Sequence, residues 1–144
     1  MRHNKFFSAA IVLCMIALFT MSWVPIPISK PDQVSITMTF TSITGGVWTG
    51  TFTTSGSGSL PASGTCTMAA KPLGKTALHC TNTLITSSGT ITIFSYCQFS
   101  TSPSKGQWHI VTGTGAYASL KGNGSLLMPE AEAGPIEAMT GRIY

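Results

Sequence analysis

Residues Val34 to Thr41 read VSITMTFT, and this stretch decides the class of fold. Its apolar side chains, Val34, Ile36, Met38 and Phe40, alternate with serine and threonine. Because successive side chains of a strand point to opposite faces, this period of two predicts a strand with one buried face and one polar face. Similar segments recur along the chain, so we expect an all-β protein.

Seven further segments have strand-like sequences and are separated by turns that contain glycine, proline or serine. They span Val47 to Thr54, Thr65 to Ala70, Thr76 to Thr86, Thr90 to Ser100, Gln107 to Thr112, Ser125 to Met128 and Ile136 to Tyr144. Roughly eight short strands at this spacing are typical of a sandwich or a barrel. We predict a single antiparallel β-domain over residues 34–144.

The composition excludes several other classes of protein. The chain has 144 residues, enough for one domain, and only 8% of them are charged. Exposed helices need Glu, Lys, Arg and Ala, so a helical bundle or a coiled coil is not expected. The Lys and Arg residues form no stripe, so nucleic-acid binding has no electrostatic basis. The low charge and a threonine-coated outer face suit both cell-surface association and simple solubility.

The N-terminus has the pattern of a secretory signal. A basic start, MRHNK, precedes an apolar run from Phe6 to Val24. Cleavage after Ser22 would remove a signal helix over residues 1–22, and the protein would be secreted, periplasmic or on the cell surface. The alternative is an uncleaved membrane anchor, because the run is just long enough to span a bilayer. The three prolines in residues 23–33 predict an extended linker.

Three cysteines, Cys66, Cys80 and Cys97, lie in the expected β-domain. Hairpins centred on Leu73 and near Ser88 would place all three on adjacent rungs of neighbouring strands. Directly opposed Cα atoms lie about 5 Å apart, which is within disulfide range. We therefore expect one disulfide, either Cys66–Cys80 or Cys80–Cys97, and one remaining thiol.

The sequence contains no clear catalytic or metal-binding pattern. His79 and His109 are each out of phase with their apolar neighbours, so both are expected on the surface. Glu137 is expected on the outer side of the last strand, which would leave the inward faces free of acids. The segment from Gly113 to Ala118 fits a dinucleotide-binding pattern, but no helix can follow it, so we interpret it as a turn. No catalytic residue, metal ion or cofactor is predicted.

The aromatic residues Trp48, Phe52, Trp108 and Tyr117 are expected to face the interior. Their default role is a filled core. In a small barrel the same residues could instead line a cavity that holds one small ligand. Both interpretations stay open, and these four residues are the candidate ligand-binding set.

A longer motif resembles a known family. The stretch from Trp108 to Gly124, WHIVTGTGAYASLKGNG, resembles the signature strand–turn–strand of barrels similar to allene oxide cyclase and dirigent proteins. It is closer still to a group of secreted, uncharacterised bacterial proteins, and the segments from Trp48 to Phe52 and from Thr140 to Tyr144 resemble that group's first and last strands. The resemblance implies an eight-stranded antiparallel barrel. Gly46-Val47-Trp48 gives a weaker likeness to the lipocalins.

The resemblance implies less about activity than about fold. Cyclases of this shape convert an unsaturated fatty-acid epoxide inside the barrel, and dirigent proteins steer the radical coupling of phenols, but no residue here matches their functional positions. We expect an exported, non-catalytic barrel that binds a small apolar or aromatic ligand. The alternatives are a cyclase- or isomerase-type enzyme that uses the barrel cavity, and a structural or surface-interaction protein with a filled core. Membrane contact is expected only through an uncleaved N-terminus.

Overall fold

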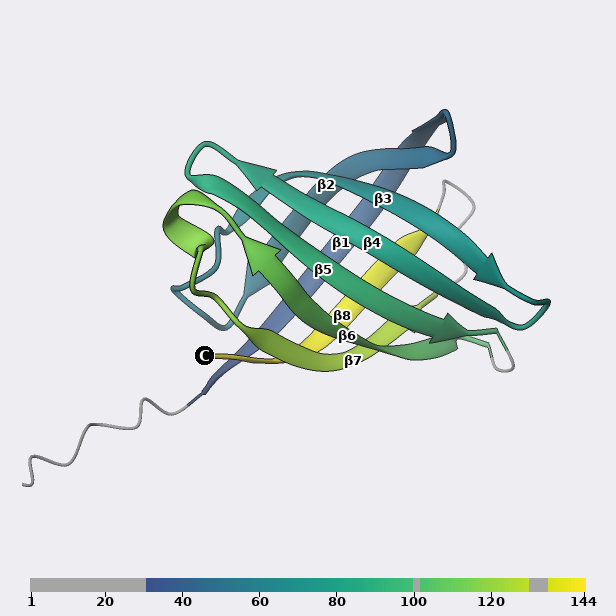
Figure 1. Cartoon of the computed structure of the whole chain (residues 1–144). Helices are drawn as coiled ribbons and strands as arrows, with labels where there is room; N and C mark the ends of the chain where they lie inside the picture. Colours follow the sequence, from purple (N-terminus) through teal and green to yellow (C-terminus); the bar gives the residue numbers. More distant parts are fainter. Residues whose placement is uncertain (1–30, 100–101, 130–134) are drawn as a thin grey trace, which may run out of the picture.

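The computed structural model describes residues 31–99, 102–129 and 135–144, which form a closed antiparallel barrel of eight strands (Figure 1). The strands are β1 (Asp32–Thr44), β2 (Val47–Ser55), β3 (Ser63–Leu73), β4 (Ala77–Thr86), β5 (Gly89–Gln98), β6 (Ser104–Gly113), β7 (Gly122–Met128) and β8 (Ile136–Ile143). Each strand pairs with the next in the chain, and β8 pairs back onto β1. The barrel is therefore confirmed over the sandwich, and closure satisfies both edges of the sheet.

The opening strand shows how the sequence builds the wall. Val34, Ile36, Met38 and Phe40 point inward and are at most 4% exposed, while the hydroxyl residues between them face outward. A register shift between Phe40 and Ser42 then interrupts the pairing of β1 with β2. Beyond this irregularity the two strands continue as a projecting, exposed hairpin (Figure 1).

All eight expected strands are present, and several are longer than expected. β1 begins at Asp32 and β7 at Gly122, because cross-strand pairing continues past the alternating core of each segment. The expected signal helix and most of the linker fall in residues 1–30, outside the described residues.

One end of the barrel is closed by the connection between β6 and β7. This connection contains a single 3-10 turn, η1 (Gly115–Tyr117), at the left end of Figure 1. Tyr117 is buried there, as is Leu60 from the β2–β3 connection. The backbone N–H of Ala116 donates to the Ser88 carbonyl at 3.0 Å and so ties η1 to the β4–β5 turn. The segment that we interpreted as a turn thus caps the barrel.

At the opposite end, residues 100–101 and 130–134 of the β5–β6 and β7–β8 connections lie outside the described residues. Four inward-facing side chains, each close to a connection at this end, are only half-buried: Trp48, Ala70, Leu78 and Met128. They come from β2, β3, β4 and β7, and this end of the barrel, with the tight turn between β3 and β4, is at the right of Figure 1. We call the end that these four residues surround the mouth.

Candidate functional site

The interior of the barrel contains a cluster of polar side chains. Asn82 on β4, Ser95 on β5 and Glu137 on β8 are all completely buried. Strand alternation places them there, because each shares an inward face with apolar neighbours two residues away. We call these three residues, together with the Cys80 thiol beside them, the polar cluster.

Hydrogen bonds connect the cluster across the barrel. The Asn82 amide donates from Nδ2 to Glu137 Oε2 at 2.8 Å and to Ser95 Oγ at 3.2 Å. Asn82 and Glu137 are 55 residues apart in the chain, and only closure of the sheet brings them together. Cys80 is opposite Ser95 in the β4–β5 register, and its thiol also hydrogen-bonds the Glu137 carboxylate.

Burial changes the acidity of Glu137. It raises the pKa of this carboxyl from an ordinary 4.5 to about 7, and the hydrogen bonds from Asn82 and Cys80 partly offset the rise. The cause is desolvation, which disfavours the charged form of an acid. A carboxyl with this pKa can both accept and release a proton near neutral pH, as a general acid–base catalyst must.

Two atoms of the cluster lack any hydrogen-bond partner. Glu137 Oε1 and Asn82 Oδ1 are both buried and unpaired. An unsatisfied buried polar atom costs about 1–3 kcal/mol, and nearly all such atoms in native proteins are paired. The two atoms belong to hydrogen-bonded neighbours, so this part of the interior has unused hydrogen-bonding capacity.

The three cysteines lie inside the barrel as free thiols, so the expected disulfide is wrong. In the β3–β4 register Cys66 is opposite Leu84, and Cys80 is opposite Ala70. In the β4–β5 register Cys97 is opposite Leu78. The turns are centred elsewhere than the sequence suggested, so no two cysteines share a rung.

The thiols are also poor nucleophiles. Burial, reinforced by the nearby Glu137 charge, raises the pKa of Cys66 to about 11 and that of Cys80 to about 12. The pKa of Cys97 is raised by the same two causes. Because the thiolate is the reactive form, all three cysteines stay protonated and inert at neutral pH.

The four predicted aromatic residues face the interior but do not form one patch. Trp48 lies at the mouth and Tyr117 at the closed end. Phe52 is 1% exposed and packs over Gly64, where a Cβ would come within 2.7 Å of its ring. Trp108 is equally buried and packs over Gly141, and its indole N–H donates to the Thr140 carbonyl at 3.2 Å.

Sequence reasoning missed the most informative side chain. Glu137 was expected on the outer face of β8, and that expectation is wrong, because it is completely buried beside Asn82. The signal was available in the sequence. Glu137 alternates with Met139 and Ile143, which are inward and buried, so its phase was that of the core.

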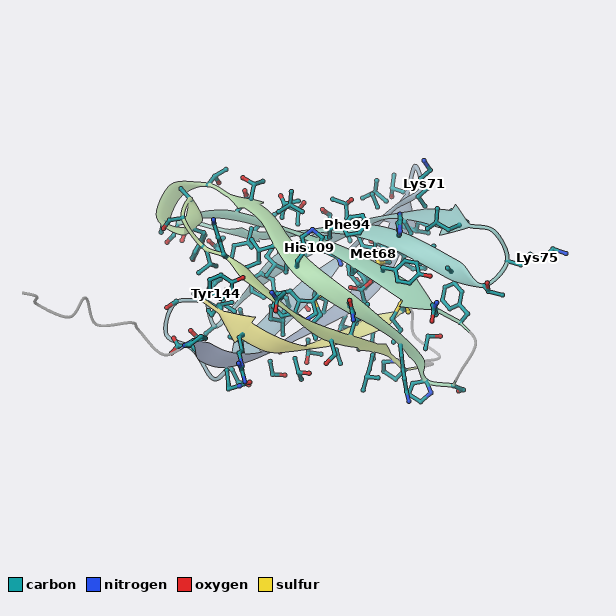
Figure 2. The ribbon with its side chains drawn as sticks, turned by 60° about the horizontal axis from the view of Figure 1, so that its bottom comes forward. Met68, Lys71, Lys75, Phe94, His109 and Tyr144 are labelled. Carbon is teal, nitrogen blue, oxygen red and sulfur yellow. The ribbon has the colours of Figure 1, made fainter. Side chains whose placement is uncertain are left out.

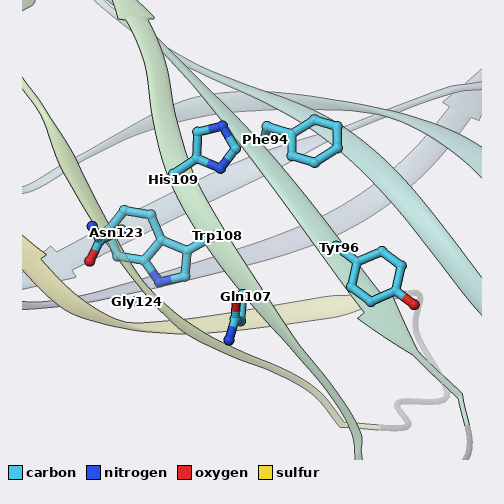
Figure 3. Close-up of a pocket in the computed structure, with 7 residues that line it drawn as sticks. All are labelled: Phe94, Tyr96, Gln107, Trp108, His109, Asn123 and Gly124. Atoms are coloured by element: carbon cyan, nitrogen blue, oxygen red, sulfur yellow. The ribbon is translucent and has the colours of Figure 1, made fainter.

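The outer wall has a depression of about 530 Å³ across β5, β6 and β7 (Figure 3). It is lined by Phe94, Tyr96, Gln107, Trp108, His109, Asn123 and Gly124. Both histidines lie on this outer face, as expected, and the Phe94 ring contacts His79 at 4.9 Å and His109 at 5.4 Å between ring centres. These rings partner one another, whereas the polar cluster has unpartnered atoms. The interior is therefore the stronger candidate site.

The described residues leave other kinds of site without support. They include no group of three or more His, Cys, Asp or Glu side chains placed to hold a metal ion. Within the same ranges no helix has the length and apolar character needed to span a membrane. Searches of protein-family models, curated proteins and solved structures find no match to this chain.

Proposed function

We propose that this protein binds one small, largely apolar molecule inside the barrel, with the polar end of that molecule at Glu137 and Asn82. The observation that carries the proposal is the pair of unpartnered, fully buried oxygen atoms, Glu137 Oε1 and Asn82 Oδ1. The four half-buried side chains that surround the mouth support a route of entry from that end. Ligand sites in small barrels occupy the same place, an interior with few polar groups among many apolar ones.

The walls around the polar cluster suit an apolar ligand body. Glu137 is flanked in register by Met38, and Asn82 by Met68 and Ile93. Methionine side chains are flexible and fill irregular gaps, so they can adapt to an inserted molecule. The polar cluster would then fix the orientation of the ligand, and the surrounding apolar side chains would supply the binding area.

The likeness to allene oxide cyclase and dirigent barrels belongs to this proposal. The motif from Trp108 to Gly124 forms the second part of β6, η1 and the start of β7, which position the cap rather than the polar cluster. Its support is therefore for a shared architecture. We further propose that residues 1–22 direct export, so that the barrel works in the periplasm, at the cell surface or outside the cell.

A second candidate function is proton-transfer catalysis of the isomerase or cyclase type. The pKa of about 7 for Glu137 favours it, since catalytic acids and bases work best when their pKa is near the working pH. In such a reaction the carboxylate would remove a proton from the carbon next to a carbonyl and return it two carbons further along, at the far end of a β,γ double bond. The double bond would move, and no other reagent would be consumed.

Fluorescent probe binding tests the first function. N-phenyl-1-naphthylamine should bind the full chain saturably and gain fluorescence. Ala70→Trp should abolish this binding, because Ala70 points into the mouth. The control is Ala69→Trp, which should keep the binding because Ala69 is exposed on the outer face. Equal binding by the two variants, or no saturable binding at all, would refute an interior site.

The two functions can be separated with cyclohex-3-enone. An isomerase would convert it to the conjugated cyclohex-2-enone, which absorbs in the ultraviolet. Glu137→Gln should remove this conversion, since an amide cannot carry the proton, while Ala138→Ser on the outer face of the same strand should preserve it. Probe binding without any conversion would leave ligand binding as the function and exclude this reaction.

A further inference from the structure

The hydrogen-bond donors of the polar cluster are all engaged. Asn82 uses its Nδ2 for both Ser95 and Glu137. The Ser95 hydroxyl hydrogen-bonds Cys80, and the Cys80 thiol in turn hydrogen-bonds Glu137. With Glu137 ionised, these contacts form a closed ring in which the Asn82 N–H groups, the Ser95 hydroxyl and the Cys80 thiol each have an acceptor.

The remaining capacity consists of acceptors. Asn82 Oδ1 is a carbonyl oxygen and can only accept, and an ionised Glu137 Oε1 can only accept as well. Neither atom can be satisfied by a ligand that offers carbonyl or ether oxygens alone. A molecule that completes this site must bring hydrogen-bond donors.

The described part of the barrel interior also contains no positive charge. The basic side chains of the described residues are all exposed, and Figure 2 shows two of them, Lys71 and Lys75, pointing away from the barrel. The others are Lys105, Lys121 and Arg142. The groups that face Glu137 from β3, β4 and β5 are the thiols Cys66, Cys80 and Cys97, which stay neutral because their pKa values are raised. An ionised Glu137 is therefore a buried charge without a counter-ion, which is costly unless a cation joins it.

Resting on the proposed function, we propose that the ligand is an apolar amine, whose nitrogen donates hydrogen bonds to Glu137 Oε1 and Asn82 Oδ1 and supplies the missing positive charge. A protonated primary amine has up to three N–H donors, which suits two unpaired acceptors better than the single donor of an alcohol. A carboxylate has none and would place a second negative charge beside Glu137.

Binding of an amine should depend on the ionisation of Glu137. An alkyl amine keeps its proton between pH 6 and pH 8, since its pKa is close to that of lysine, about 10.4. Glu137 changes from mostly protonated to mostly ionised over the same interval, because its pKa is about 7. The affinity for the amine should therefore be about tenfold higher at pH 8 than at pH 6.

Three probes with the same apolar tail test this inference: hexylamine, hexanol and hexanoate. Each is titrated into the full chain against bound N-phenyl-1-naphthylamine. We expect hexylamine to compete at least tenfold more strongly than hexanol at pH 8, and hexanoate to be the weakest. Glu137→Gln should remove the advantage of hexylamine and its dependence on pH, whereas Ala138→Ser should retain both.

The outcomes distinguish this inference from the proposed function. If hexanol or hexanoate competes as well as hexylamine, the inference of an amine ligand is wrong, while the proposed interior site remains. If hexylamine is preferred equally by the Glu137→Gln variant, the amine binds elsewhere and the inference fails. If neither the fluorescent probe nor any of the three competitors binds, the interior site itself is refuted.

Discussion

The two ends of the barrel use glycine in contrasting ways. At the closed end, Gly89 and Gly115 have φ values of 142° and 58°, and a Cβ on either would lie 2.2 Å from a backbone carbonyl oxygen. At the mouth, Gly45, Gly46 and Gly74 also have positive φ, but a Cβ on any of them would meet nothing within 4 Å. The first pair is required by close packing and by backbone conformation, and the second set by conformation alone.

The two ends of the barrel also differ in the contacts that their residues make. The closed end is held by backbone-to-backbone approach, which fixes η1 and keeps Tyr117 in the interior. The mouth carries half-buried apolar side chains, and Glu137 is the second residue of β8, the strand that starts at this end. Under the proposed function, a ligand would therefore reach Glu137 from the mouth rather than from the closed end.

The largest expected effect is the loss of stability when a glycine at the closed end is changed to alanine, compared with the same change at the mouth. Gly74→Ala should cost about 1–2 kcal/mol, the strain of a left-handed conformation in an open turn. Gly115→Ala has the same strain and also collides with the Ser88 carbonyl, so it should cost about 4 kcal/mol. Urea unfolding followed by tryptophan fluorescence measures both. Equal losses of unfolding free energy in the two variants would mean that the closed end is not packed more closely than the mouth.

The next effect concerns Glu137 and depends on pH. The folded protein binds this proton more tightly than the unfolded chain, because the pKa is about 7 when folded and close to 4.5 when exposed. The contribution of Glu137 to stability is thus fully present below pH 4.5 and is lost as the pH rises through 7. The loss should be about 3 kcal/mol.

Unfolding free energies of wild type and Glu137→Gln, measured from pH 4.5 to pH 8, isolate that contribution. The variant cannot ionise at this position, so its stability should vary less with pH, by the amount assigned to Glu137. Ala138→Ser, one residue away on the outer face, should keep the wild-type dependence. If Glu137→Gln shows the same pH dependence as wild type, the carboxyl is not held in a dry interior.

The sequence predicted the closed end better than the polar cluster. Alternation within each strand is a local property, and it located all eight strands. The turn over Gly113 to Ala118 was likewise visible from its glycines. Closure into a barrel rather than a sandwich came from the resemblance and not from strand spacing, which both architectures share.

The polar cluster depends on information that single strands do not contain. The disulfide prediction failed because register is set by turn length, and shifted turn centres moved every cysteine off the expected rung. Glu137 was expected on the outer face although its phase matches that of Met139. Burying a carboxyl is costly unless it is hydrogen-bonded, and β8 alone does not show that a partner exists. Its partner Asn82 could not be found without knowing that β8 closes toward β4 across the interior.

The smallest expected effect tests what seals the closed end. The Tyr117 hydroxyl is 3.4 Å from Thr86 Oγ1, a long contact for two hydroxyl groups. Tyr117→Phe should therefore cost less than about 1 kcal/mol, whereas Tyr117→Ala, which removes a buried ring, should cost about 3 kcal/mol.

Because Tyr117 lies away from the mouth, Tyr117→Phe should bind the fluorescent probe as wild type does. A loss of unfolding free energy from Tyr117→Phe as large as that from Tyr117→Ala would mean that the hydroxyl, not the ring, holds the closed end together. Weaker binding of the probe by Tyr117→Phe would place the ligand near the closed end.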